Sequence, residues 1–238
     1  MTKLPMARIQ VPRLPLPRHV LCDRVVLWIT AGFAIVALSL IASHTLITAY
    51  QSVGGRVDGR IEGRAAGLVM AAGWLLYGTS LVASAISSLI YNGWHKHRQS
   101  SPWRFADHIC IFLLIAGTYT PFALATGRIG SLLAPIWVMA AVGIALKIIL
   151  RLRFDRWFVV FYLAMGWLVV IGIDRIAASL PSAAFGLLLA GGLIYSAGVV
   201  FYILDARFRW GSTVWHSAVL VAQASHFVAI FGWLMVAG

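Results

Sequence analysis

The chain has 238 residues, of which 61% are hydrophobic and 11% are charged, and its formal net charge is +12. Soluble domains carry about a quarter of charged residues, so this composition excludes an ordinary soluble domain and indicates a membrane protein. The basic residues lie between apolar stretches, where membrane topology and anionic lipid headgroups account for them better than nucleic acid does. We therefore expect membrane lipids as partners, and no nucleic acid.

The first segment, residues 1–24, is a basic tail that contains four prolines. With its prolines and scattered arginines, such a segment cannot bury a core, so we expect it to be extended or disordered. Its arginines act most simply as a topology signal. Docking to lipid or to a partner is the alternative function of the tail.

Seven apolar stretches follow the tail, each about as long as the 20 residues that a helix needs to cross a bilayer. Their residue ranges are 25–48, 66–91, 107–126, 131–150, 157–178, 183–204 and 213–236. The hydrocarbon core offers no hydrogen-bond partner to an open backbone, so each stretch is expected to be helical. The sequence predicts an all-α polytopic membrane protein with a seven-helix transmembrane domain over residues 25–238.

Lysine and arginine are distributed unevenly among the gaps between these stretches. Fourteen of the 19 basic residues lie in the tail or in every second gap, and the remaining five lie in the other gaps. Short cytoplasmic loops are enriched in Lys and Arg, so this bias predicts a cytoplasmic N-terminus. With seven spans, the C-terminus is then expected outside.

Polar residues collect at the ends of helices that this orientation directs toward the cytoplasm. Ser88 and Asn92 close the second span with i, i+4 spacing, which puts them on one helix face. Asp107 begins the third span, and Ser212 and His216 begin the seventh, again with i, i+4 spacing. We expect these five side chains to lie at similar depth and to share one pocket.

An ionisable residue in a membrane is costly to bury and is therefore a functional candidate. Three interpretations of Asp107 and His216 stay open: a carboxylate that orients an imidazole, part of a metal site, or a hydrogen-bond network between helices. A catalytic zinc normally has three protein ligands, and only one clear histidine belongs to this group. The loop residues His95 and His97 could supply a missing ligand, whereas His226 lies about 15 Å deeper along the last helix.

Several motifs resemble the hemolysin III family, which is similar to the progestin and adiponectin receptors and the alkaline ceramidases. The segment Ser88–Asn92 resembles that family's Ser-x-x-x-His sequence. Further matches are Phe105–His108, Ile111–Phe122, Tyr162–Trp167, Gly191–Tyr202 and Val214–Phe227. The resemblance covers about residues 74–234, and the first helix does not show the family's usual acidic and histidine-bearing start.

The resemblance implies seven helices, a cytoplasmic N-terminus and a zinc ion held by three histidines, which in ceramidase-like relatives activates water to hydrolyse a lipid amide. Ser88 and Asp107 match the family's serine and aspartate, and are the candidate catalytic residues. His216 matches one zinc ligand. Asn92 and Ser212 replace the other two, so they are expected to line the pocket. The loss of two imidazoles counts against zinc, which is the only cofactor that the sequence suggests.

Three functions remain, and the sequence leaves open whether the protein is an enzyme. The favoured one is a non-catalytic hemolysin III-like protein with a degenerate metal site, acting in lipid sensing, partner interaction or membrane homeostasis. The first alternative is a metal-dependent intramembrane hydrolase of a lipid amide or ester, and the second is a proton or ion path. We expect the protein in the bacterial inner (plasma) membrane. The sequence identifies no substrate, protein partner or oligomeric state.

Overall fold

A computed structural model describes residues 16–54, 61–95, 102–127, 129–150, 155–171 and 173–235. These described parts contain helices and turns and no strand, which confirms the all-α expectation. The first fifteen residues of the predicted tail and the loop histidine His97 lie outside the described residues, and so does the side chain of His95.

The helical elements follow one another with short connections. In chain order they are α1 (Arg18–Gly54), α2 (Ile61–Ile90), η1 (Tyr91–His95), α3 (Pro102–Ala125), η2 (Ile129–Leu133), α4 (Ala134–Leu150), α5 (Asp155–Gly166), η3 (Trp167–Val170), α6 (Ile173–Ser179), α7 (Ser182–Leu204), α8 (Gly211–Ala229) and η4 (Ile230–Met235). Here η1, η2 and η4 are short π-helical turns and η3 is a 3₁₀ turn.

Six segments of the described chain are long and apolar enough to cross a membrane. They are Arg18–Tyr50, Ala66–Trp94, Pro102–Ala125, Gly130–Leu150, Ser182–Ile203 and Gly211–Gly232. The apolar composition that predicted spanning helices therefore produces them in six of the seven places.

The stretch predicted as the fifth span, residues 157–178, is not one continuous helix. Its apolar helical part is Trp157–Val170, followed by a turn at Ile171 and the separate short helix α6. A side chain from α3 pairs with the backbone near this break: the Tyr119 hydroxyl donates to the Gly166 carbonyl at 2.6 Å and accepts from the Val169 N–H at 3.0 Å. Such partners are needed wherever a helix is interrupted inside a membrane.

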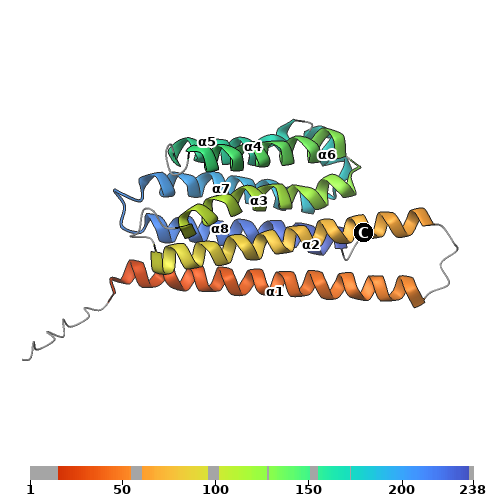
Figure 1. The fold of residues 1–238 in the computed structure, drawn as a ribbon, viewed down its shortest axis with the longest axis horizontal. Helices are drawn as coiled ribbons and strands as arrows, with labels where there is room; N and C mark the ends of the chain where they lie inside the picture. Colours follow the sequence, from red (N-terminus) through yellow and green to blue (C-terminus); the bar gives the residue numbers. More distant parts are fainter. Residues whose placement is uncertain are drawn as a thin grey trace, which may run out of the picture.

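The long helices lie side by side in a bundle, so that their ends gather at the two ends of the bundle (Figure 1). α1 packs against α2 and α8, α2 against α3, and α7 against α8. α4, α5 and α6 lie on the side of the bundle away from α1 (Figure 1). At the left of Figure 1 lie the starts of α1, α3 and α8 and the ends of α2 and α7, and we call this the polar end of the bundle.

The first helix begins earlier than the predicted start at residue 25. The carbonyl of Pro17 accepts from the backbone N–H groups of Val20 at 2.9 Å and Leu21 at 3.1 Å, so helical hydrogen bonding begins directly after this proline. Proline is well tolerated at such a position because the first turn needs no N–H from it. The consequence is that Asp23 belongs to α1 and not to a tail.

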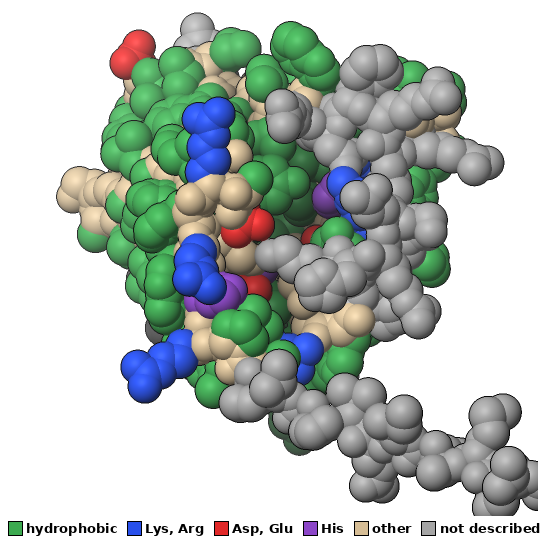
Figure 2. All heavy atoms as spheres, turned by 90° about the vertical axis from the view of Figure 1, so that its left-hand side faces the viewer, with side chains coloured by type: hydrophobic (Ala, Val, Ile, Leu, Met, Phe, Trp, Pro, Cys, Tyr) green, Lys and Arg blue, Asp and Glu red, His purple; other side chains and the backbone are tan. Residues whose placement is uncertain are grey.

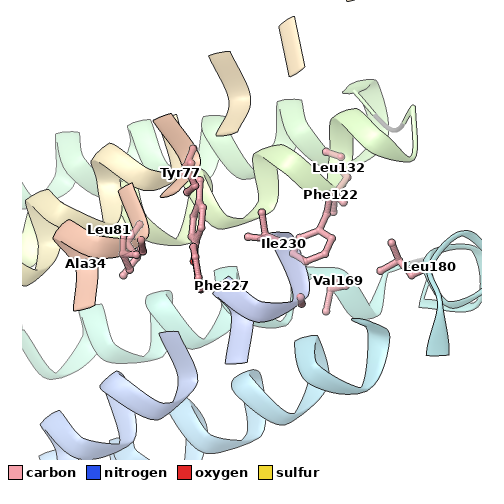
Figure 3. Close-up of a cluster of buried hydrophobic side chains, with 14 of the residues drawn as sticks. Ala34, Tyr77, Leu81, Phe122, Leu132, Val169, Leu180, Phe227 and Ile230 are labelled. Atoms are coloured by element: carbon pink, nitrogen blue, oxygen red, sulfur yellow. The ribbon is translucent and has the colours of Figure 1, made fainter. Parts of the chain in front are cut away.

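Small residues allow the helices to approach one another closely, as is usual in membrane bundles. On α7, a Cβ added to Gly198 would lie 2.8 Å from the Ala218 Cβ of α8, closer than real carbon atoms pack. Between α1, α2, α3 and α8, the largest cluster of buried apolar side chains includes Tyr77, Phe227 and Ile230 (Figure 3). This packing holds the polar ends of these four helices at one level.

Candidate functional site

A cavity of about 650 Å³ lies inside the bundle. Residues of α1, α2, α3, α5, α7 and α8 line it, and most of its wall is apolar. The predicted residues Ser88, Asn92, Asp107, Ser212 and His216 are all among the lining residues. The structure thus brings together, around one cavity, the side chains that the orientation argument expected to meet.

The α2–α3 side of the polar end is built around Asp107. This residue is buried, and its carboxylate accepts hydrogen bonds from the side chains of Ser88 and Asn92. The Asn92 amide nitrogen also lies 3.1 Å from both the carbonyl and the hydroxyl oxygen of Ser88. Ser88 and Asn92 therefore act together as hydrogen-bond donors that hold the Asp107 carboxylate of α3 in place.

The α1–α8 side is built around His216, and here the structure corrects the expected pairing. The hydrogen-bond partner of the imidazole is Asp23, whose Oδ1 lies 2.6 Å from Nδ1, whereas the sequence paired His216 with Asp107. The Ser212 hydroxyl donates to the other oxygen of Asp23 at 3.1 Å. An ionised carboxylate only accepts hydrogen bonds, so Nδ1 carries a proton and Nε2 is the ring nitrogen left for a ligand.

The start of α8 is fixed by two further hydrogen bonds. The Ser212 N–H donates to Asp205 Oδ1 at 2.7 Å, and the Thr213 hydroxyl donates to the backbone carbonyl of His19 on α1 at 3.1 Å. The first N–H groups of a helix have no partner within it, and a carboxylate suits the positive end of the helix dipole. These contacts fix the position from which His216 reaches the cavity.

The electrostatic arrangement at the polar end is two carboxylates near one imidazole. Asp107 lies close enough to His216 to interact with it electrostatically, and Asp23 forms a direct hydrogen bond with the same imidazole. Viewed onto this end, acidic side chains lie near the middle with basic side chains close by, another acidic side chain lies at the upper left edge, and hydrophobic side chains cover the left flank (Figure 2). A ligand head here meets acceptors and negative charge, which favours hydroxyl, amide or amine groups.

The donor set does not fit the zinc site that the resemblance implied. Within the described ranges, no three His, Cys, Asp or Glu side chains lie in a group that could hold a metal ion. The residues at the two replaced positions are engaged otherwise, Asn92 with Ser88 and Ser212 with Asp23. An amide and a hydroxyl are also weak substitutes for imidazole as zinc ligands.

Among the other histidines, His226, His108 and His44 occupy different positions along the helices. His226 lines the deeper cavity, and its Nε2 lies 3.1 Å from the Leu188 carbonyl. His108 is buried next to Asp107, and its backbone carbonyl accepts from the Tyr162 hydroxyl at 2.9 Å. His44 packs edge-on against aromatic rings on α2 and η4.

Asp23 is the residue of the site that sequence reasoning missed. Two signals in the sequence point to it: it is one of only seven acidic residues in the chain, and it lies immediately before a long apolar run. Treating it as part of the tail hid its role, because a tail residue needs no partner. Inside α1 the side chain is only 10% exposed, so its carboxylate requires a hydrogen-bond partner.

Comparisons with known proteins agree with the motifs. The family model described as haemolysin-III related matches residues 22–227. The hemolysin-3 of Bacillus cereus is 36% identical over 163 residues, covering 67% of this chain and 74% of that protein. The hemolysin-3 homolog of Bacillus subtilis (strain 168) is 37% identical over 158 residues, covering 65% and 74% of the two chains.

A human protein is also similar. The monocyte to macrophage differentiation factor of Homo sapiens is 30% identical over 171 residues, covering 67% of this chain and 69% of that protein. The family match begins just before Asp23, so it takes in α1, which the sequence motifs did not reach. With a matching family model over most of its length and helices that suit a bilayer, this chain is an integral membrane protein of the haemolysin III family.

Proposed function

We propose that the protein is a non-catalytic, metal-independent lipid-binding member of its family, which senses a single-chain lipid in the cavity. The observation that carries this proposal is the hydrogen-bonded group of Asp23, Ser212 and His216, which occupies the place of a metal-ligand set at the mouth of a largely apolar cavity. A cavity with apolar walls and a few polar groups at one end suits an amphipathic ligand.

The charges at the polar end define the head of this lipid. Asp23 and Asp107 would repel a free carboxylate, and the Ser88 and Asn92 donors are already directed at Asp107. What remains for a ligand is acceptor capacity on Asp107 and the Nε2 of His216. A neutral head with hydroxyl groups, such as that of a monoacylglycerol, satisfies both.

Thermal unfolding in detergent, with and without EDTA, tests the proposal. Monostearoylglycerol is expected to raise the stability of the wild-type protein by about 2.7 kcal/mol at a hundred times its Kd, equally with and without chelator. Stearic acid is expected to bind more weakly because of its charge. His216→Gln should lose most of the ligand-induced shift, and His44→Gln, a histidine outside the cavity lining, should keep it.

The opposing outcome is enzymatic. Release of stearate and glycerol from monostearoylglycerol, dependent on a metal and abolished by EDTA, would replace this proposal with the hydrolase alternative. A lipid that leaves the unfolding temperature unchanged at every concentration would equally overturn it.

We propose further that the chain crosses a bacterial plasma membrane seven times, with α5, η3 and α6 together making the fifth crossing and the polar end facing the cytoplasm. The concentration of basic residues in the tail and in alternate gaps supports this orientation. Alkaline phosphatase fused after Gly238 is then expected to be active, and green fluorescent protein fused there to be dark. Fluorescence of the second fusion and an inactive first one would refute the seven-span topology.

A further inference from the structure

A second polar region lies deep in the same cavity, toward the middle of α8. Gln223 follows His216 by seven residues, which corresponds to about 10 Å along a helix. With Tyr195 of α7 and His226 it lines the cavity. We call these three residues the deep subsite. Polar side chains at this depth in a membrane bundle are costly unless they are paired.

The amide of Gln223 is only half paired. It hydrogen-bonds to the Tyr195 hydroxyl, while its Oε1 has no partner among the described residues although the residue is only 2% exposed. If the two ends of the amide are exchanged, the nitrogen is left in the same situation. Either way, one strong hydrogen-bonding atom of a residue that lines the cavity has no protein partner within the described chain, and leaving it so costs about 1–3 kcal/mol.

The rest of the deep subsite is rigid, so Gln223 cannot easily find a partner by rearrangement. His226 is held to the Leu188 carbonyl, and its ring packs against Tyr195 with ring centroids 5.9 Å apart. That ring also fills the space where a side chain at Gly191 would begin. Ser225 adds a hydrogen bond to the Leu187 carbonyl at 2.8 Å, which ties α8 to α7 at the same level.

A neighbouring group extends the polar character of this region. The Tyr77 hydroxyl, on α2, is near enough to Tyr195 to interact with it electrostatically, and it too has no hydrogen-bond partner within the described chain. Tyr77 is 1% exposed and belongs to the same buried cluster as Phe227 (Figure 3). The wall of the deep subsite is thus polar although apolar packing surrounds it.

We propose that the deep subsite binds a hydroxyl group carried near the middle of the acyl chain of the bound lipid. Such a hydroxyl donates to the free amide oxygen of Gln223 and accepts from the Tyr195 O–H, whereas a methylene group can do neither. This assignment rests on the proposed function, because it specifies the acyl chain of the same lipid whose head group is proposed to bind at the polar end.

Two matched lipids test this assignment: monostearoylglycerol and the same lipid with one hydroxyl near mid-chain. The hydroxylated lipid is expected to bind the detergent-purified protein about ten-fold more tightly, the effect of one net hydrogen bond at the upper end of its usual range. A third lipid with the hydroxyl at the end of its chain is expected to show no gain, because its hydroxyl lies beyond Gln223.

Variants separate the hydrogen bond from general packing. Gln223→Leu keeps most of the side-chain volume and is expected to abolish the preference, because neither lipid then finds a polar partner at this position. Tyr195→Phe, which removes one oxygen atom only, should reduce the preference even if the first variant does not fold. Thr118→Val is the control: Thr118 lines the cavity, but its hydroxyl is already bonded to the Leu114 carbonyl at 2.8 Å.

The outcomes distinguish the two proposals. Equal affinity for the two lipids in the wild-type protein, as expected if a water molecule fills the deep subsite, would overturn the subsite and leave lipid binding standing. Failure of all three lipids to bind would overturn both. A preference that survives Gln223→Leu and Tyr195→Phe would also refute the assignment.

Discussion

Asp23→Ala is expected to lower the free energy of unfolding by about 2–5 kcal/mol, because two buried donors lose their acceptor and each unsatisfied group costs about 1–3 kcal/mol. The variant leaves His216 Nδ1 and the Ser212 hydroxyl without the acceptor that both now use. Asp23 belongs to α1, and Ser212 and His216 belong to α8. The variant therefore weakens the contact between these two helices. Chemical or thermal unfolding in detergent micelles measures the effect.

Two variants control for this loss. Asp23→Asn keeps an oxygen that can accept from Nδ1 and is expected to lose distinctly less stability than Asp23→Ala. Asp174→Ala removes a carboxylate that is exposed on α6, and is expected to stay within about 0.5 kcal/mol of the wild type. If Asp23→Ala were no more destabilising than Asp174→Ala, the hydrogen bonds of Asp23 would not contribute to stability.

The double variant Asn92→His/Ser212→His is expected to bind one zinc ion per chain, whereas the wild-type protein is expected to contain no stoichiometric zinc. Together with His216 the variant offers three imidazoles, two from α8 and one from η1, which is the set that the resemblance assigns to zinc. Zinc sites of this kind contribute on the order of 10 kcal/mol, so the change should be all-or-none in elemental analysis.

Single variants provide the comparison for the double variant. Each adds one imidazole to His216 and is expected to lose its metal during purification, because two protein ligands hold zinc far less firmly than three. The double variant with His216→Ala added should lose the ion again. Stoichiometric zinc in the wild-type protein, purified without chelator, would contradict the prediction and favour the metal-dependent hydrolase hypothesis.

Much of the fold follows from composition and periodicity. Apolar length alone locates the helices, because the membrane admits few other structures. The gathering of Ser88, Asn92 and Asp107 also follows, since i, i+4 spacing and alternating helix direction leave few other arrangements. A site at the ends of helices is therefore unusually accessible to prediction once the direction of each helix is fixed.

Two features of the structure could not be predicted from the sequence, because both depend on tertiary contacts. No periodicity reveals that Asp23 bonds to His216, 193 residues away, because the pairing depends on how α1 packs against α8. The interruption after Val170 was equally hidden, since the stretch is apolar throughout and the partner that stabilises the break, Tyr119, belongs to another helix. Sequence reasoning located the polar residues correctly and paired two of them differently.

The bond between α1 and α8 has a consequence for biosynthesis. A ribosome delivers the first helix to the bilayer long before the last one is translated, so Asp23 enters the membrane region without the imidazole that later binds it. Until then, water and lipid headgroups must solvate this carboxylate. The first and last helices are joined only when translation is nearly complete, which makes closure of the bundle a late step of assembly and leaves any prematurely terminated chain open.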